Sequence, residues 1–341
     1  MKKLWNNGTV FNESCMFAGK RQAKLFFAAN EVLKVENPSK GIVYQENIDY
    51  TFVPGDDKIE LTGDSRIPYI SAEQLHPTEN LRIHPEKNSN AIGNAVDGGY
   101  LLFNNENFFA LNQVEVTYRA DTSGFSFGLD AQSDRLPATR RRIAEGKLLK
   151  VALHGDSISE GYNSTEFTGT FPYLPPYMKQ VCAALPIECD FTNFAVGGKG
   201  IKFPRSIRND WINHKPDLMV IAFGMNNFGN TPVADFMAEL DWIIKENSAV
   251  SPDTEYIIVM SMPGNPEWKP TVSGPDLEYA AAFRKYVENA PANVALADVH
   301  HVWSQLLRRK SFYDLTGNGV NHPNDYGHRV YASVILELLP G

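Results

Sequence analysis

The sequence has no long hydrophobic run, few cysteines and no extended block of basic residues. A helix that crosses a membrane needs about 20 consecutive apolar residues, so no membrane partner is expected. The first residues, Met-Lys-Lys-Leu-Trp-Asn-Asn-Gly, are basic, but the apolar stretch of a signal peptide does not follow them. These absences predict a cytoplasmic protein, unless a secretion signal has been removed.

The cysteines and the charges bear on three further questions: metal binding, the redox compartment and binding of nucleic acid. Cys15, Cys182 and Cys189 do not have the spacing of metal ligands, and their odd number leaves at least one free thiol. A free thiol favours a reducing compartment, although a disulfide between Cys182 and Cys189 stays open. The net charge is −8 and the acidic residues are spread along the chain, so nucleic acid is not an expected partner.

Two motifs that bind nucleotides or phosphate are also missing. Neither Gly-x-Gly-x-x-Gly nor Gly-x-x-x-x-Gly-Lys-Ser/Thr occurs, and residues 196–200 resemble a phosphate-binding loop only superficially. A nucleotide or phosphate ligand is therefore disfavoured. Around Ser157 the Gly-x-Ser-x-Gly elbow of α/β-hydrolases is incomplete, because Ser159 stands where its second glycine would be.

The first part of the chain is predicted to be a β-rich accessory domain over residues 1–135. Short runs of aromatic and β-branched residues alternate with turn residues, which is typical of a β-sandwich or jelly roll. The predicted strands lie at 23–28, 41–44, 50–53, 58–62, 100–103, 108–111, 113–118 and 124–128. Residues 64–94 are irregular and rich in proline, asparagine and histidine, and we expect them to loop over a neighbouring part of the protein.

The second part of the chain changes to apolar strands that alternate with amphipathic stretches. Residues 136–147 predict a linker helix, and residues 148–341 predict one α/β domain. Strands are expected at 149–153, 190–194, 218–223, 256–262 and 294–299, with helices at 172–185, 203–214, 232–246, 277–290, 299–309 and 324–339. This alternation predicts a parallel sheet with helices on both faces, the flavodoxin-like three-layer αβα architecture.

Polar residues and glycines gather at four points of this domain, after strands or before the last helix. The four segments are Gly-Asp-Ser-Ile-Ser at 155–159, Asn-Phe-Ala-Val-Gly-Gly at 193–198, Gly-Met-Asn-Asn at 224–227 and Asn-His-Pro-Asn-Asp at 321–325. Open α/β sheets bind their ligands at this edge. A buried strand that ends in a tight turn predicts that Ser157 is presented where a helix begins.

Together, these segments contain the groups that acyl transfer needs. Ser157 is the candidate nucleophile, and His322, held by Pro323 at a helix start, is the candidate base. A backbone N–H at Gly198, the side-chain amide of Asn226 and the N–H of Ser157 can donate hydrogen bonds to a developing oxyanion. Four such segments in this order are far more specific than any one of them.

These residues resemble the SGNH, or GDSL-type, hydrolase family. The resemblance covers about residues 148–340, and it rests on Gly155-Asp-Ser157 with Ile-Ser, Asn193 with Gly198, Gly224-Met-Asn226 and His322-Pro323. It implies an esterase that needs no metal or organic cofactor, with Ser157 as nucleophile, His322 as base and an oxyanion hole of Ser157, Gly198 and Asn226. Segment 155–163 is also similar to that of two-domain members that deacetylate carbohydrates and carry a β-sandwich before the hydrolase domain.

The residue that orients the histidine departs from the family pattern. The family usually has an aspartate three residues before the histidine, where this chain has Gly319. Asn318 lies one residue earlier, and its amide oxygen can accept a hydrogen bond from His322 without stabilising the charged ring. Asn318 is therefore the candidate orienting residue, with Asp314, Asp325 or a backbone carbonyl as alternatives.

The sequence as a whole predicts a serine esterase for short acyl esters, with acetyl esters favoured and carbohydrate as a candidate alcohol. Tyr162 and Trp268 are candidate substrate-binding residues, beside the acyl group and a sugar ring respectively. The alternatives are a carbohydrate-binding adaptor with a decayed esterase domain, and a lipase or thioesterase for other acyl esters. A metal triad of His322, Asp325 and His328 is less favoured, because no further ligands lie near it in sequence. The oligomeric state is left open.

Overall fold

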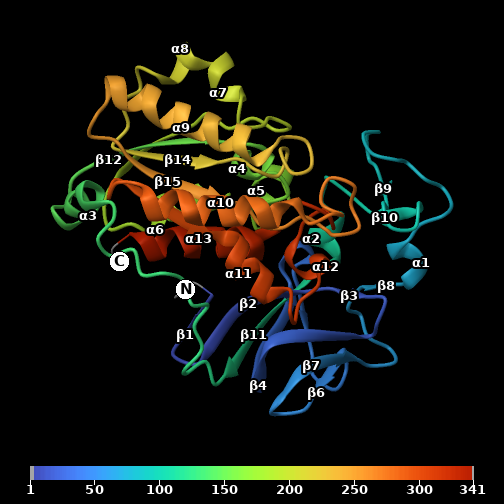
Figure 1. Cartoon of the computed structure of the whole chain (residues 1–341). Helices are drawn as coiled ribbons and strands as arrows, with labels where there is room; N and C mark the ends of the chain where they lie inside the picture. Colours follow the sequence, from blue (N-terminus) through green and yellow to red (C-terminus); the bar gives the residue numbers. More distant parts are fainter. Residues whose placement is uncertain (1–3, 340–341) are drawn as a thin grey trace.

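A five-stranded parallel sheet forms the centre of the second part of the chain (Figure 1). The computed structural model describes residues 4–339. The strands are β12 (Leu149–Gly155), β13 (Cys189–Asn193), β14 (Leu218–Ala222), β15 (Glu255–Met260) and β16 (Val294–Asp298), in the order β13-β12-β14-β15-β16. This is the predicted flavodoxin-like sheet. The direction of its strand order reverses beside β12, and α/β proteins place their sites at such a switch point.

Helices cover both faces of the parallel sheet, as predicted. Helices α9 (Val233–Val250) and α10 (Pro275–Asn289) pack together, and α13 (Asp325–Leu338) packs with α6 (Tyr177–Ala184) and α11 (Val299–Leu306). Right-handed crossovers place α6 on the face opposite α9 and α10. The residues of β14, β15 and β16 are all buried, which explains their continuous apolar character.

Short helices complete the α/β domain and its connection to the first part of the chain. They are α3 (Pro137–Ala144), α4 (Ser157–Glu160), α5 (Thr165–Thr168), α7 (Phe203–Ser206), α8 (Arg208–Trp211) and α12 (Phe312–Leu315). Helix α3 lies within the predicted linker. The division of the chain into domains at residues 135 and 147 stays a prediction.

The first part of the chain forms an antiparallel sheet against the α/β domain, as Figure 1 shows below α11 and α13. Its seven strands are β1 (Trp5–Asn6), β2 (Thr9–Cys15), β4 (Gln22–Asn37), β5 (Ile42–Tyr44), β6 (Tyr50–Phe52), β7 (Asp56–Leu61) and β11 (Val114–Ala120). They follow the order β1-β2-β11-β4-β7-β6, and β5 also pairs with β4. The predicted β-rich character of the first part is thus confirmed, and its main sheet is antiparallel.

The remaining elements of the first part are short. Two small sheets pair β3 (Phe17–Ala18) with β8 (Tyr69–Ile70) and β9 (Ala91–Gly93) with β10 (Tyr100–Leu102). The helices there are η1 (Pro38–Lys40), α1 (Ala72–Leu75) and α2 (Phe108–Asn112). One hydrophobic core continues from the antiparallel sheet into α11 and α13, so the two parts of the protein share their interior.

Two predicted strands have a different structure. Residues 108–111 lie in helix α2, because Asn104 Oδ1 accepts two backbone N–H groups and starts a turn ahead of this helix. Residues 124–128 form no strand. The backbone oxygen of Phe127 instead accepts hydrogen bonds from two side chains of α11. Both segments bond to nearby side chains rather than to a neighbouring strand, which a pattern of aromatic residues does not reveal.

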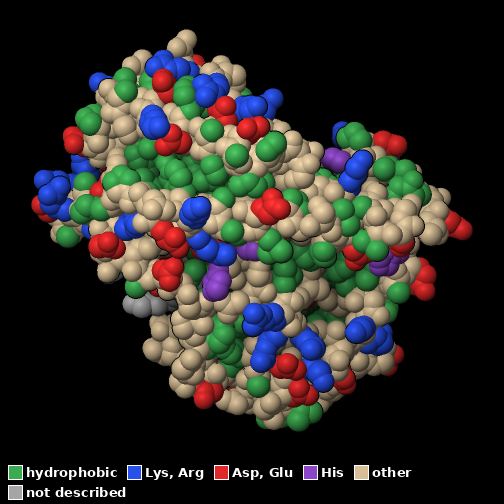
Figure 2. Space-filling model, viewed as in Figure 1, with side chains coloured by type: hydrophobic (Ala, Val, Ile, Leu, Met, Phe, Trp, Pro, Cys, Tyr) green, Lys and Arg blue, Asp and Glu red, His purple; other side chains and the backbone are tan. Residues whose placement is uncertain are grey.

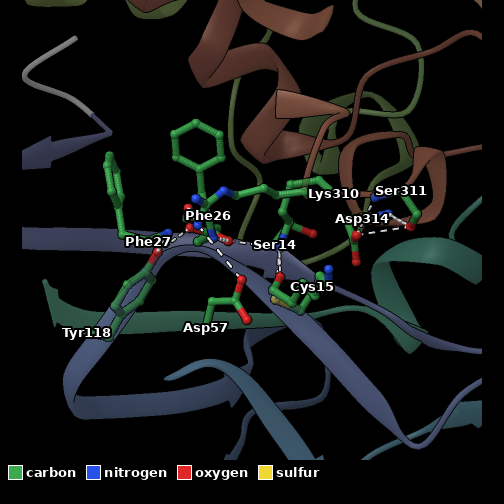
Figure 3. A network of polar contacts seen from close by, with 12 residues as sticks. Ser14, Cys15, Phe26, Phe27, Asp57, Tyr118, Lys310, Ser311 and Asp314 are labelled. Atoms are coloured by element: carbon green, nitrogen blue, oxygen red, sulfur yellow. Dashed lines mark hydrogen bonds and ion pairs between the residues drawn. The ribbon is translucent and has the colours of Figure 1, made fainter. Parts of the chain in front are cut away.

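A lysine of the α/β domain is buried in the interface with the antiparallel sheet (Figure 3). Lys310, which follows α11, is fully buried, and its Nζ lies 2.8 Å from Glu13 Oε1 of β2. The same ammonium donates to the Lys24 oxygen at 2.6 Å and to the Cys15 sulfur at 3.1 Å. Glu13 also accepts a hydrogen bond from the Tyr118 hydroxyl at 2.7 Å. Each member of the charged pair therefore has further hydrogen-bond partners besides the other.

The protonation of this cluster follows from its burial. Burial raises the pKa of the Cys15 thiol to about 12. Burial opposes the charge on Lys310, but its neighbours Cys15, Glu13 and Asp314 raise the pKa of Lys310 well above its usual value. The lysine thus stays charged in the interior, where each partner of the pair depends on the other.

Most other charges lie at the surface. On the face drawn in Figure 2, basic and acidic side chains are interspersed. The pair Lys245–Asp241 is an example of an exposed contact, with the lysine side chain 75% accessible. Between residues 4 and 339, no helix combines the length and the apolar character that crossing a bilayer requires.

Replacing Lys310 with methionine should lower the free energy of unfolding by about 3–5 kcal/mol, because Glu13 is then buried without its counter-charge. Urea titration measures this change. The matched control is Lys245→Met in the exposed pair, for which we expect a loss below about 1 kcal/mol. Combining Lys310→Met with Glu13→Gln should restore part of the loss. Equal losses in Lys310→Met and in the control would contradict a structural role of the buried pair.

Candidate active site

Ser157 lies where strand β12 gives way to helix α4, as predicted. Asp156 caps this helix, and its Oδ1 accepts a hydrogen bond from the Ile158 N–H at 3.0 Å. Burial raises the pKa of Asp156 to about 7. The turn requires Gly155, since a Cβ there would lie 2.9 Å from the Ala222 oxygen of β14. Close packing of the strand ends therefore fixes the position of the serine.

The structure brings Ser157 and His322 together from distant parts of the chain. Ser157 Oγ lies 2.8 Å from His322 Nε2, and both side chains are buried. His322 lies two residues before Asn324, which is the N-cap of α13. Burial, followed by repulsion from His328 and His84, lowers the pKa of His322 to about 3. The imidazole is therefore neutral at ordinary pH and can accept a proton from the serine.

An asparagine holds the other ring nitrogen of His322. His322 Nδ1 lies 2.8 Å from Asn163 Oδ1. Asn163 Nδ2 donates to the Gly317 oxygen at 3.1 Å and to the Glu106 oxygen at 3.4 Å. Because carbonyl oxygens only accept hydrogen bonds, the amide oxygen must face the ring, and Nδ1 carries the proton. Nε2 is then the acceptor for the hydroxyl of Ser157.

The prediction that Asn318 orients the histidine ring is wrong, because Asn163 occupies that place. Asn318 is fully buried, and its Oδ1 accepts the backbone N–H groups of Val320, Asn321 and His322 at 3.0–3.1 Å. This side chain folds the turn on which the histidine stands. Because Asn318 is only four residues before His322, its side chain bonds to the backbone N–H of His322 and not to the imidazole ring.

The side chains of the alternative orienting residues and of the proposed metal triad have partners other than the His322 ring. Asp314 accepts the Met16 N–H at 2.8 Å, and Asp325 accepts the N–H and the hydroxyl of Thr165 at 2.8 and 2.7 Å. His328 stacks on an aromatic ring of α6. In the described part of the chain, no three His, Cys, Asp or Glu side chains are grouped so that they could hold a metal ion.

The N-terminal region packs against Gly319, the position three residues before His322 at which the family usually has an aspartate. Gly319 has a φ of 81°, in the left-handed region that favours glycine. A Cβ at this residue would lie 2.8 Å from the Leu102 oxygen and 2.9 Å from the Phe109 ring. An aspartate would displace the segment that contains β10 and α2. The orienting group therefore comes from a different loop, at Asn163.

The candidate oxyanion donors lie on both sides of Ser157, because β12 is paired with β13 and β14. Gly198 follows β13 and Asn226 follows β14. Asn226 Nδ2 donates one hydrogen bond to the Lys199 oxygen at 3.0 Å, which leaves its second N–H available. The backbone N–H groups of Gly198 and Ser157 have no acceptor within residues 4–339. The structure thus brings these donors to the carboxyl edge of the parallel sheet. Their role as an oxyanion hole stays a prediction.

Tyr162 lies beside the Ser157–His322 pair. Its ring centroid is 5.3 Å from that of His322 and 4.3 Å from that of Phe167. A Cβ at Gly197 would lie 3.2 Å from the Tyr162 hydroxyl, so this side chain also borders the loop of the candidate oxyanion hole. The position is consistent with the predicted contact to the acyl group.

Trp268 has a different environment from Tyr162. Its ring packs in a cluster with Phe103 and Val320, and its backbone forms an isolated bridge with Asn94. The contacts of Trp268 are thus with the N-terminal region and with the loop before His322. Its predicted contact with a sugar stays a prediction.

A three-layer α/β domain with a Ser–His pair at the carboxyl edge of its sheet is the arrangement expected of a serine hydrolase. The comparison with protein families assigns the chain more narrowly. The model of the GDSL-like lipase/acylhydrolase family matches residues 153–330, and the chain belongs to this family. It is therefore a carboxylic ester hydrolase. A comparison with curated proteins gives no match.

Similar solved structures are members of the same group of hydrolases. A lipolytic G-D-S-L family protein from Veillonella parvula is 20% identical over 56% of this chain and 97% of its own, with a TM-score of 0.45. The acetylxylan esterase Axe2 from Geobacillus stearothermophilus is 18% identical over 56% and 94%, with a TM-score of 0.44. A two-domain esterase active on acetylated mannans is 22% identical over 60% and 52%, with a TM-score of 0.45.

Replacing Asn163 with alanine should lower kcat for p-nitrophenyl acetate by on the order of 10²-fold or more, because nothing then keeps the proton on Nδ1 of His322. KM should change little, and steady-state kinetics measures both. The matched control is Asn289→Ala at the exposed end of α10, where we expect kcat within about twofold of wild type. A loss below about threefold in Asn163→Ala would show that another group orients the histidine.

Proposed function

We propose that this ester hydrolase acts on short acyl esters, with acetyl esters of carbohydrates favoured, through an acyl-enzyme on Ser157. The observation that supports this mechanism best is the 2.8 Å contact between Ser157 Oγ and His322 Nε2. The opposite ring nitrogen is bound to the Asn163 amide at 2.8 Å. The proton of the serine therefore has a defined acceptor when the oxygen attacks.

The proposed reaction has two acyl-transfer steps. Ser157 Oγ attacks the ester carbonyl while His322 Nε2 takes its proton, and the oxyanion accepts hydrogen bonds from the N–H groups of Ser157 and Gly198 and from the Asn226 amide. His322 then gives the proton to the leaving alcohol. Water, deprotonated by the same histidine, attacks the acyl group and releases the acid.

The neutral amide changes how the charged histidine is stabilised. Asn163 fixes the tautomer of His322 but supplies no negative charge to the imidazolium that forms during each step. In this proposal the oxyanion donors and the short-lived oxyanion itself balance that charge. The serine and the histidine thus act as a dyad with an amide as orienting group.

A short acyl group is supported by the aromatic side chains at the candidate oxyanion loop. Tyr162 stands between His322 and Gly197, and Phe167 packs on its other side. Rings in this position limit the space beside the ester carbonyl. The preference for acetylated carbohydrate rests on the similarity of segment 155–163 to that of carbohydrate deacetylases with two domains.

Two alternative functions can be distinguished from the proposed acetyl esterase by activity assays. A carbohydrate-binding adaptor with a decayed esterase domain is disfavoured by the intact Ser157–His322 contact and by the available oxyanion donors. A lipase or a thioesterase would use the same dyad and differ only in substrate. Chain-length and leaving-group preference therefore distinguish these from the proposed acetyl esterase.

Replacing Ser157 with alanine should lower kcat for p-nitrophenyl acetate by about 10³-fold or more, because the nucleophile is lost. The matched control is Ser206→Ala, an exposed serine of α7 that should retain full activity. Wild-type enzyme should also release acetate from acetylated xylose and should prefer p-nitrophenyl acetate over the octanoate. Turnover that survives Ser157→Ala, or a wild type without any turnover, rejects the serine-esterase mechanism, and a preference for octanoate indicates a lipase.

The acidic side of the pH profile should lie well below the usual range of histidine. Burial lowers the pKa of His322 to about 3, and the base is active in its neutral form, so kcat/KM falls only when the pH approaches that value. For p-nitrophenyl acetate we expect kcat/KM at about pH 5 to stay within about twofold of its value at about pH 7. Near-UV circular dichroism at each pH checks that the fold persists. A half-maximal loss near pH 6.5 with the fold intact would show that the histidine is not held in this environment.

A further inference from the structure

The alcohol part of the substrate must lie next to His322. In the proposed mechanism, Nε2 of this ring gives a proton to the leaving oxygen, which therefore approaches the ring edge that faces Ser157. The oxyanion donors follow β13 and β14 and mark the side of the carbonyl oxygen. Residues beside the histidine loop, on the side away from the oxyanion donors, are therefore candidates for contact with the alcohol.

The N-terminal region builds the surface beside the histidine loop. Val320, two residues before His322, is fully buried in a cluster with Phe103, and Trp268 packs against this cluster. The loop after β15 joins the two, because the Asn265 N–H donates to the Val320 oxygen at 2.9 Å. A residue of the N-terminal region thus lies in contact with the turn that carries the candidate base.

This part of the N-terminal region is anchored firmly to the α/β domain. Figure 1 shows β9 and β10 apart from the large antiparallel sheet, beside the loop that follows β15. Asn94 Nδ2 lies 2.8 Å from Glu267 Oε2, and the Ala95 N–H donates to the Glu267 oxygen at 2.7 Å. The irregular segment predicted to loop over a neighbour therefore reaches the site side of the α/β domain.

His84 extends from this segment toward solvent. Its backbone N–H donates to the Ala91 oxygen at 2.8 Å, and its ring lies 4.8 Å from the Phe103 ring, which is itself buried. The His84 side chain is exposed, and its ring nitrogens have no hydrogen-bond partner within the described residues. When His84 is protonated, its charge also lowers the pKa of His322.

We propose that His84 is a specificity-determining residue that hydrogen-bonds the alcohol part of the substrate, and that this alcohol carries several hydroxyl groups, as a sugar does. The proposal rests on the serine-esterase function above. A neutral imidazole offers one donor and one acceptor, which suits neighbouring hydroxyls. The support of the Phe103 ring keeps the imidazole in place while both nitrogens stay available. The N-terminal region then selects the alcohol, and the α/β domain performs the chemistry.

The test compares one acyl group on two alcohols in the full-length protein. His84→Ala should lower kcat/KM for acetylated xylose by about tenfold or more, and for ethyl acetate by less than about twofold. His84→Gln, which keeps a donor and an acceptor, should recover part of the activity on acetylated xylose. His76→Ala is the matched control, because His76 is an exposed histidine of the same region at the end of α1. Unfolding in urea should be the same for all variants.

The outcomes separate this proposal from the esterase function itself. An unchanged ratio between the two acetates in His84→Ala, in an enzyme whose turnover depends on Ser157, overturns the role of His84 and leaves the mechanism intact. An equal fold-loss of kcat/KM on both acetates is one case of an unchanged ratio, and it indicates an effect on the chemistry rather than on recognition of the alcohol. A wild type without preference for acetylated xylose over ethyl acetate also rejects the proposal. Absence of turnover on every ester overturns the esterase function and this proposal together.

Discussion

The hydrogen bond between His322 Nδ1–H and the Asn163 amide is the interaction on which the whole site depends. It decides which nitrogen faces Ser157, and it holds only if the amide itself cannot turn. Two backbone oxygens, of Gly317 and Glu106, prevent that rotation by accepting both N–H groups of the amide. Glu106 belongs to the N-terminal region, so the accessory part of the chain supports the orientation of the candidate base.

Contact between the two parts of the protein also leaves no room for an aspartate at residue 319. Gly319 is pressed against the Leu102 oxygen and the Phe109 ring, and no carboxylate fits there. An amide from another loop replaces it, and the ring stays in a buried site without a negative neighbour. The buried pair of Lys310 and Glu13 joins the two parts a second time, within one continuous core. The N-terminal region is thus built into the hydrolase rather than attached to it.

The sequence predicted the α/β domain well because its signals are local. Buried parallel strands appear as apolar runs, and each is followed by the glycines and polar residues of a loop, so Ser157, Gly198 and Asn226 could be placed at one edge before the structure was known. The N-terminal region was harder to predict. Residues 108–111 and 124–128 have the composition of strands, yet side-chain hydrogen bonds to their backbone decide their conformation.

Residue type and periodicity along the chain by themselves predicted the α/β domain and the polar ends of its strands. The resemblance of the motifs at those ends indicated the family and the roles of Ser157 and His322. Only the tertiary structure decided the orienting residue. Asn318 lies near His322 in sequence, but a turn that short directs its amide to the backbone of that residue. Asn163 is 159 residues away from His322 in sequence, and its side chain reaches the ring. The backbone of Asn163 itself is in the left-handed region, with a φ of 61°. Contacts of this kind depend on how distant segments of the chain pack, and they leave no periodic signal in the sequence.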